Sequence, residues 1–234
     1  MPYRRLPNTD QARLRALKAA YKKGTLLNPW DLAYSQKLYL QLKAFLPLFE
    51  QAIDQYNFSK DRQAKYGKLL NDQFKEARLY VSHFLQVLNF CIIRGEIKPD
   101  VRVTLGLEID EKSVPEMGTE QQLIYWGKKI INGEHQRMLA GGNRIYNPSI
   151  AIVKIKYEKF IEYYNTHKNL QVTTKKMHEK VISLRDKADA LILYIWNEIE
   201  AKFEDQPGDV RRKKCADYGI IYMFRRQEKE TASN

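Results

Sequence analysis

Cysteine, glycine, proline and long apolar runs are all scarce in this sequence of 234 residues. Its two cysteines, Cys91 and Cys215, exclude a small domain held together by several disulfides. A hydrophobic content of 44% excludes a disordered chain, which lacks the apolar residues needed to offset the entropy of ordering. The longest apolar run covers residues 191–196, whereas about 20 apolar residues are needed to span a bilayer. The composition therefore predicts a globular chain without a membrane-spanning helix.

Signals for export are also scarce. No apolar stretch follows Met1–Arg5, so we expect no secretory signal. Two cysteines far apart in the sequence are typical of a reducing compartment, and we expect a cytoplasmic protein. The apolar neighbours of Cys91 predict a raised thiol pKa, whereas the four basic residues before Cys215 predict a lowered one.

Positive charge is abundant and unevenly placed. The formal net charge is +12, from 40 basic and 28 acidic residues. Residues 1–27 hold seven basic residues and one acidic residue, and residues 207–234 hold seven and four, so the middle of the chain is nearly balanced. The excess charge therefore belongs mainly to the two terminal segments.

Two terminal clusters of Lys and Arg are the candidate polyanion-binding residues, because such clusters bind phosphate backbones by releasing counterions. Their members are Arg4, Arg5, Arg13, Arg15, Lys18, Lys22 and Lys23, and Arg211, Arg212, Lys213, Lys214, Arg225 and Arg226. They would form one patch if the two ends of the chain meet. No helix-turn-helix, zinc-finger or RNA-recognition motif accompanies them, so a solvated charged surface is the competing interpretation.

Apolar residues recur at every third or fourth position in four long segments, a pattern typical of packed helices. The segments pair into two predicted helical hairpins, over residues 28–95 and 147–206, with turns near 57–60 and 165–169. A single unbroken helix over 148–205 is the alternative. The pattern predicts a mainly α fold, an antiparallel four-helix bundle of two long hairpins with short extra helices.

The other segments are expected to decorate this bundle within one domain. Alternating apolar residues over 101–109 predict a strand, which would pair with a strand-like end at 218–224 in a small two-stranded β element. Thr119 and Gln122 form a capping-box pattern at the start of a helix. The predicted segments are a basic N-terminal helix at 1–27, a connector at 96–146 and a basic C-terminal segment at 207–234.

The two predicted hairpins also resemble each other. A shift of 108 positions aligns Tyr56 with Tyr164, and a shift of 107 aligns Leu70 with Met177. A turn between these stretches would absorb the one-residue difference. An internal repeat is one interpretation, and the general likeness of any two heptad-patterned helical pairs is the other.

Motifs for familiar catalytic chemistry are missing. None of the four histidines has Glu three positions before it, as di-metal bundle sites require, and no zinc-binding spacing occurs. Phosphate-binding, dinucleotide-binding and serine-nucleophile motifs are missing too. We therefore predict no catalytic residue, metal or cofactor, although a site assembled from scattered carboxylates is left open.

Three stretches are distinctive: residues 141–148 (GGNRIYNP), 195–200 (IWNEIE) and 211–222 (RRKKCADYGIIY). Together they resemble a family of uncharacterised, mostly helical proteins from Bacteroides-type bacteria. That family has no assigned activity, so the resemblance implies a bacterial helical protein and carries over no functional residue.

These observations lead to two functional expectations. The first is a non-enzymatic helical-bundle protein that acts through protein–protein contacts, with another protein or a second copy of itself as partner. The alternative is a nucleic-acid-binding protein that uses the basic terminal segments.

Overall fold

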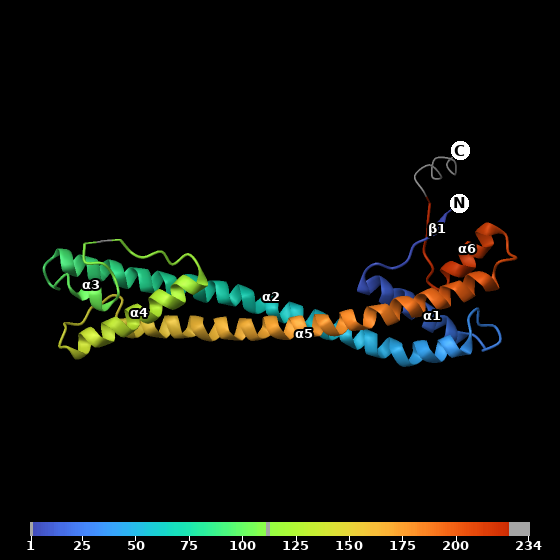
Figure 1. The fold of residues 1–234 in the computed structure, drawn as a ribbon, viewed down its shortest axis with the longest axis horizontal. Coiled ribbons are helices and arrows are strands. Elements are labelled where there is room, and N and C mark those ends of the chain that lie inside the picture. Colours follow the sequence, from blue (N-terminus) through green and yellow to red (C-terminus); the bar gives the residue numbers. More distant parts are fainter. Residues whose placement is uncertain (1, 111–112, 225–234) are drawn as a thin grey trace. The chain divides into compact units, whose positions relative to one another are not determined.

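The computed structural model describes residues 2–110 and 113–224, so Arg225 and Arg226 lie outside the described residues. The described chain is mainly helical with one small antiparallel sheet, and α2 and α5 pack together, which confirms the predicted mainly α bundle. In chain order the elements are β1 (Tyr3–Arg4), α1 (Asp10–Leu26), α2 (Gln36–Ile93), α3 (Val101–Thr104), α4 (Glu120–Leu139), α5 (Ile150–Lys202), α6 (Gly208–Ala216) and β2 (Tyr222–Met223) (Figure 1).

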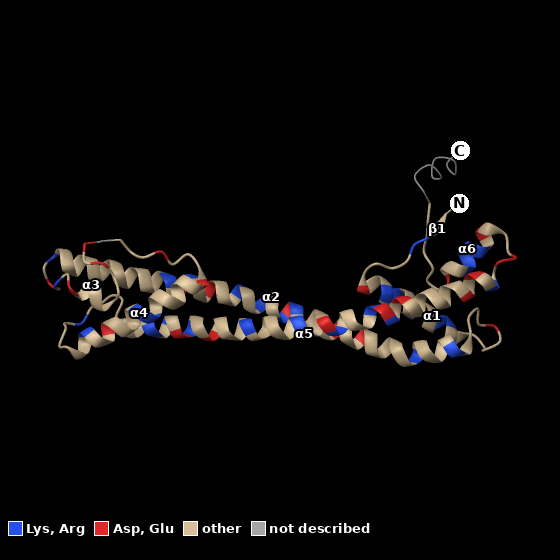
Figure 2. Cartoon of the chain, in the orientation of Figure 1, with Lys and Arg blue, Asp and Glu red and all other residues tan. Residues whose placement is uncertain are grey.

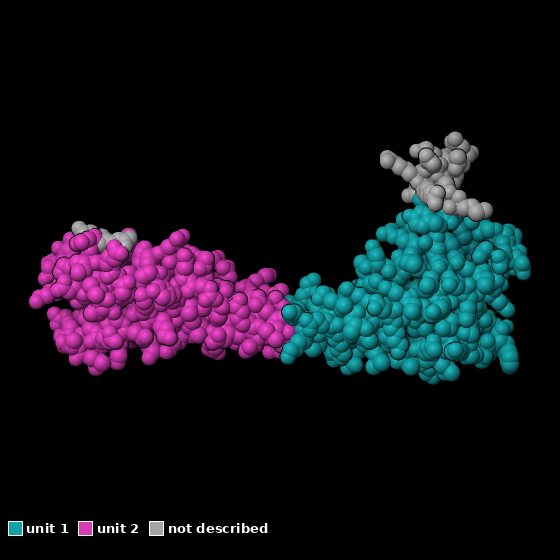
Figure 3. Space-filling view, viewed as in Figure 1, with its two compact units in different colours: residues 1–60, 174–234 teal, residues 61–173 magenta. Residues whose placement is uncertain are grey.

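The chain divides into two compact units (Figure 3). Unit 1 comprises residues 1–60 and 174–234, and unit 2 comprises residues 61–173. Helices α2 and α5 contribute to both units, and Lys and Arg are interspersed with Asp and Glu along both helices (Figure 2). Each unit has its own apolar core.

Unit 1 is built from α1, α6, the two strands, the first part of α2 and the last part of α5. The two long helices run antiparallel here: the Ser35 amide donates to Glu198 at 2.6 Å, and the ring of Tyr56 stacks on His178 at 4.8 Å. Large fully buried side chains form the core, among them Leu17, Leu42, Phe45, Phe49 and Trp196.

Unit 2 is built from α3, α4 and the remaining parts of α2 and α5. The Lys156 ammonium donates to Glu76 at 2.7 Å, which ties α5 to α2. The core residues follow the helical spacing that the sequence predicts, and those fully buried include Val81, Phe84, Leu88, Leu123 and Val153.

The predicted turns near 57–60 and 165–169 are wrong, because α2 and α5 are each a single helix. Residues 28–95 and 147–206 are therefore not hairpins, and the alternative of one unbroken helix is correct for the second segment. Small and polar residues occupy the packed faces in these regions. In unit 1 the Thr174 hydroxyl donates to the Ser59 carbonyl at 3.2 Å, and such polar contacts leave no apolar signal in the sequence.

The predicted strand over 101–109 is also wrong. Residues 101–104 form α3, where the amides of Arg102 and Val103 donate to the carbonyls of Pro99 and Asp100. The alternation of apolar and polar residues predicts that Arg102 would face solvent, but Arg102 is buried. Its guanidinium donates to the Glu108 carbonyl at 2.7 Å and to the side chain of Asn89. The C-terminal strand does form, at 222–223, but its partner is β1.

The capping box predicted at the start of α4 is confirmed, whereas the first long helix, expected from residue 28, begins at Gln36. Thr119 and Gln122 form a complete capping box, with the Gln122 amide donating to the Thr119 hydroxyl at 3.3 Å and the Gln122 side chain accepting from the Thr119 amide at 2.9 Å. Thr9 caps α1 by accepting from the Ala12 amide at 3.2 Å. These caps satisfy amides that have no partner inside the helix.

Candidate binding cleft at the paired terminal strands

The two basic terminal segments meet in unit 1. Tyr3 pairs with Met223 and Arg4 with Tyr222 in the antiparallel β1–β2 pair, and the Arg5 amide donates to the Ile221 carbonyl at 2.8 Å. The sequence left open whether the two ends meet. Their pairing brings described members of the two basic clusters into one region of unit 1.

Glu200 of α5 holds both strands. The Arg4 guanidinium lies 2.9 Å from one carboxylate oxygen of Glu200 and donates to Asn197 at 2.8 Å. The Tyr222 hydroxyl donates to the other Glu200 oxygen at 2.6 Å. Burial, together with this hydrogen bond, raises the pKa of Tyr222 above its ordinary value. Arg4 is thus a structural cation whose charge is already paired.

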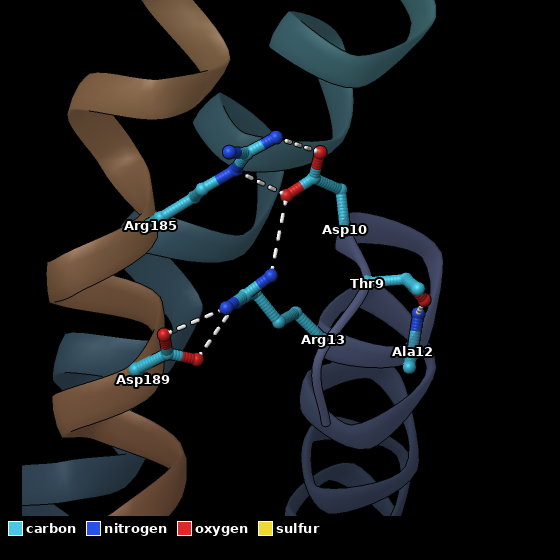
Figure 4. A network of polar contacts seen from close by, with 6 residues as sticks. All are labelled: Thr9, Asp10, Ala12, Arg13, Arg185 and Asp189. Carbon is cyan, nitrogen blue, oxygen red and sulfur yellow. Dashed lines mark hydrogen bonds and ion pairs between the residues drawn. The ribbon is translucent and has the colours of Figure 1, made fainter. Parts of the chain in front are cut away.

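Arg13 is likewise committed to structure, in a chain of four charges that joins α1 to α5 (Figure 4). Its guanidinium binds both oxygens of Asp189, at 2.7 and 2.9 Å, and lies 3.4 Å from Asp10. Arg185 binds both oxygens of Asp10 at 2.8 Å. Hydrogen bonding to Asp189 raises the pKa of Arg13, and hydrogen bonding to Asp10 raises that of Arg185. These bidentate pairs fix α1 on α5.

Three further candidate cations also have carboxylate partners. Lys18 pairs with Glu50, Lys23 lies 3.3 Å from Asp217, and Arg212 pairs with Asp209. Five candidate residues therefore have a carboxylate at ion-pair distance. The candidates for which no described carboxylate lies at ion-pair distance are Arg5, Arg15, Lys22, Arg211, Lys213 and Lys214.

Two of these remaining cations, Arg5 and Arg15, line the same cleft. The cleft has a volume of about 730 Å³ and lies between the N-terminal segment, α1 and the residues that connect α6 to β2. Among the described residues, neither Asp nor Glu lines it. The lining residues are Arg5, Leu6, Pro7, Asn8, Thr9, Ala12, Arg15, Ala16, Ala19, Trp196, Ala216, Gly219, Ile220, Ile221 and Tyr222.

The floor of the terminal cleft is apolar because small residues let two segments approach closely. Gly219 has φ +91°, and a Cβ built there would lie 2.7 Å from the Ala19 Cβ. Gly219 therefore permits both the left-handed backbone and the contact with α1. Trp196 and Ile220 are buried beneath the surface, whereas Leu6 and Ile221 are about half exposed at the edges. The cleft thus combines apolar walls with two cations.

Sequence reasoning placed Arg5 and Arg15 among the candidates but missed the apolar residues that make the cleft. Two features of the sequence could have indicated these apolar residues. Ala12, Ala16 and Ala19 recur at helical spacing on one face of α1. The distinctive stretches 195–200 and 211–222 also come together here through Glu200 and Tyr222.

Both cysteines are buried, and the expectation of a lowered pKa for Cys215 is wrong. Burial raises the pKa of both thiols, and at Cys215 the hydrogen bond with Tyr222 and the nearby cation Arg211 oppose this rise only in part. We expect neither thiol of the folded chain to react with Ellman's reagent at about pH 8, and both to react in denaturant. Rapid reaction of either thiol without denaturant would contradict this placement.

The same pKa shifts predict a pH dependence of stability. A thiol whose pKa is raised on folding ionises at a lower pH in the unfolded chain than in the folded one. Its contribution to the stability of the fold is therefore complete below the ordinary thiol pKa of about 8.5, and it is lost as pH rises above that value. We therefore expect the urea midpoint to fall between about pH 8 and 10, and Cys215→Ala with Cys91→Ala to reduce that fall.

The described residues contain no group of three or more His, Cys, Asp or Glu side chains arranged to hold a metal ion. Within the same residues, no helix has the length and hydropathy required to cross a bilayer. Comparisons with protein-family models, curated proteins and solved structures found no match to this chain. The lining residues of the terminal cleft are therefore the only guide to what it binds.

Proposed function

We propose that this chain is a non-enzymatic binding protein that acts through protein–protein contacts, and that its terminal cleft receives an acidic, partly apolar segment of a partner protein. The lining of the cleft carries the proposal: Arg5 and Arg15 line it together with apolar residues, and none of its described lining residues is a carboxylate. A guanidinium binds a carboxylate through two parallel hydrogen bonds, and an apolar floor favours neighbouring apolar side chains. The volume lies within the usual range for ligand sites, about 300–1,000 Å³.

A second feature of unit 1 supports a role in protein contacts. Trp30, between α1 and α2, is 92% exposed, and Leu26 and Leu27, a few residues earlier in the sequence, are also exposed. Tryptophan is enriched among the residues that dominate protein interfaces, and exposed large apolar side chains are available for contact with a partner.

Nucleic-acid binding ranks second because much of the basic charge is already paired. Phosphate-backbone affinity grows with the number of free cations that release counterions. Pairing of Arg4, Arg13, Lys18, Lys23 and Arg212 with carboxylates lowers that number. The expectation of a bacterial cytoplasmic protein remains part of the proposal, and it rests on the sequence alone.

Selection of peptides from a random library displayed on phage, against the full chain, tests the proposed function. We expect enriched peptides to carry Asp or Glu beside large apolar residues. Replacing both cleft cations, Arg5→Gln with Arg15→Gln, is expected to weaken these peptides about tenfold or more, because each charge-assisted hydrogen bond contributes about 1.5–3 kcal/mol. Fluorescence anisotropy of labelled peptides measures the change.

The matched control removes the same charge from exposed residues of unit 1 outside the cleft, by Lys22→Gln with Lys213→Gln. This variant is expected to keep peptide affinity within about twofold, since general charge effects are small at physiological salt. Equal losses in both variants would contradict the cleft. Binding of a single-stranded oligonucleotide that depends on Arg5 and Arg15, without any peptide enrichment, would favour the nucleic-acid alternative.

A further inference from the structure

Unit 2 contains a separate pair of adjoining cavities between α4 and the start of α5. One cavity, of about 450 Å³, is lined by α4 from Lys128 to Met138 and by α5 from Ile150 to Glu158. The other, of about 400 Å³, lies over the 144–149 segment. Both are lined by Met138, Ile150 and Ala151, and the two together are called here the α4–α5 groove.

The α4–α5 groove has an apolar floor and a cationic rim. Its apolar residues come from both helices and the connecting segment: Ile131, Met138, Ile145, Ile150 and Ala151. The basic side chains at the rim are Lys128 and His135 of α4, Lys154 of α5 and Arg144 of the connecting segment.

Two carboxylates line this groove, Glu134 and Glu158, and each has a basic partner. Glu134 is 1% exposed and is neutralised by Arg137, whose guanidinium binds both its oxygens at 2.7 Å. Glu158 lies 3.7 Å from Lys154, and both side chains are more than half exposed, so this pair is screened by water. Lys128, His135 and Arg144 have no carboxylate at ion-pair distance within the described residues.

The shape of the groove is maintained from beneath. Arg137 also donates to the Asn143 carbonyl at 2.6 Å, which fastens the 141–146 segment to the end of α4. At the other end, the Tyr157 hydroxyl donates to the Ile124 carbonyl at 2.9 Å, and its ring packs on Gly127, where a Cβ would lie 2.4 Å from the ring. The walls are therefore held in place without a ligand.

We propose that the α4–α5 groove binds a small anionic amphiphile, a molecule with one carboxylate, sulfonate or phosphate group on an apolar body. The apolar body would lie along Ile131, Met138 and Ile150, and the anionic group would face Lys128 and Lys154. This assignment concerns unit 2 alone and is independent of the terminal cleft in unit 1.

Displacement of the fluorescent anion 1-anilinonaphthalene-8-sulfonate by decanoate, from the full chain, tests the proposal. We expect decanoate to displace the probe at concentrations about tenfold below those of decyltrimethylammonium, which has the same chain and the opposite charge. Lys128→Gln with Lys154→Gln is expected to weaken decanoate about tenfold, and Ala151→Trp, which fills the groove from an exposed helical position, to abolish displacement.

The matched control, Lys75→Gln with Lys159→Gln, removes two exposed charges of unit 2 outside the groove and is expected to leave decanoate binding unchanged. If circular dichroism shows that Ala151→Trp perturbs folding, the comparison of the Lys128/Lys154 variant with the Lys75/Lys159 control still tests the proposal. Equal binding of the cationic amphiphile, equal loss in the control variant, or equal competition by inorganic phosphate would each overturn the proposal.

Discussion

Arg137→Ala is expected to lower the free energy of unfolding of unit 2 by about 3–5 kcal/mol, the usual cost of breaking a buried ion pair on one side. The side chains of Arg137 and Glu134 are 6% and 1% exposed, so the substitution leaves the Glu134 charge in an environment that water scarcely reaches. The Asn143 carbonyl loses its donor at the same time. Hydrogen exchange at the amides of α4, followed by mass spectrometry in the full chain, measures the loss.

Two companion variants identify the cause. Glu134→Leu with Arg137→Met removes both charges and keeps side-chain volume, so it should recover most of the lost stability. Lys154→Ala breaks an exposed pair and should change stability by less than about 0.5 kcal/mol. If the double variant were no more stable than Arg137→Ala, loss of packing rather than an unpaired charge would be the cause.

Gly133→Ala is expected to destabilise unit 2 by about 2–3 kcal/mol, although alanine favours helix over glycine by about 1 kcal/mol. A Cβ at this position would lie 2.4 Å from the Thr104 carbonyl oxygen and 2.9 Å from the Leu105 Cα. Both atoms belong to the backbone, so no side-chain rotation relieves the contact, and α3 must move away from α4. Urea unfolding followed by hydrogen exchange at α3 and α4 reports the change.

Gly67→Ala is the matched comparison, since Gly67 also lies inside a helix of unit 2. Its Cβ would meet only the His167 side chain, at an ordinary 3.5 Å. Helix propensity then dominates, and we expect a gain of about 0.5–1 kcal/mol. Opposite signs for the two alanines would confirm that α3 and α4 touch through their backbones at Gly133, and a gain at both positions would contradict it.

The sequence predicts the buried faces of the helices well but not where the long helices continue. Phe45, Phe49, Val81 and Phe84 lie at predicted spacings and are all buried, because helical periodicity is a local property of the chain. The turn predicted near 57–60, by contrast, is wrong. A polar stretch is compatible with a turn or with a continuing helix, and only contacts such as Thr174 to Ser59 decide between them.

The candidate site shows the same division between local and distant information. Composition identifies Arg5 and Arg15 as basic terminal residues, but it also selects Arg4 and Arg13, which the fold assigns to Glu200 and Asp189. The carboxylates that pair with Arg4 and Arg13 lie 196 and 176 positions away in the sequence, so no local pattern encodes these two pairs. The role of Arg102, a buried cation inside an apparent strand pattern, is hidden for the same reason.

The duplicate-hairpin interpretation loses its simplest support. It relied on a turn to absorb the one-residue difference between two alignments, and α2 and α5 are each continuous through the corresponding stretch. An internal repeat stays a prediction, now between two single antiparallel helices. The one-residue difference must then fall within helical backbone, where it rotates the apolar face by about 100°.

The arrangement of the two units along the chain has a consequence for the order of synthesis. Unit 2 is one continuous stretch, residues 61–173, whereas unit 1 needs residues 1–60 together with the part that begins at 174. A ribosome therefore delivers every residue of unit 2 before β2 exists to meet β1. Since domains begin to fold as they emerge, the terminal cleft is the late product of translation, and it exists only on chains extended at least to Met223.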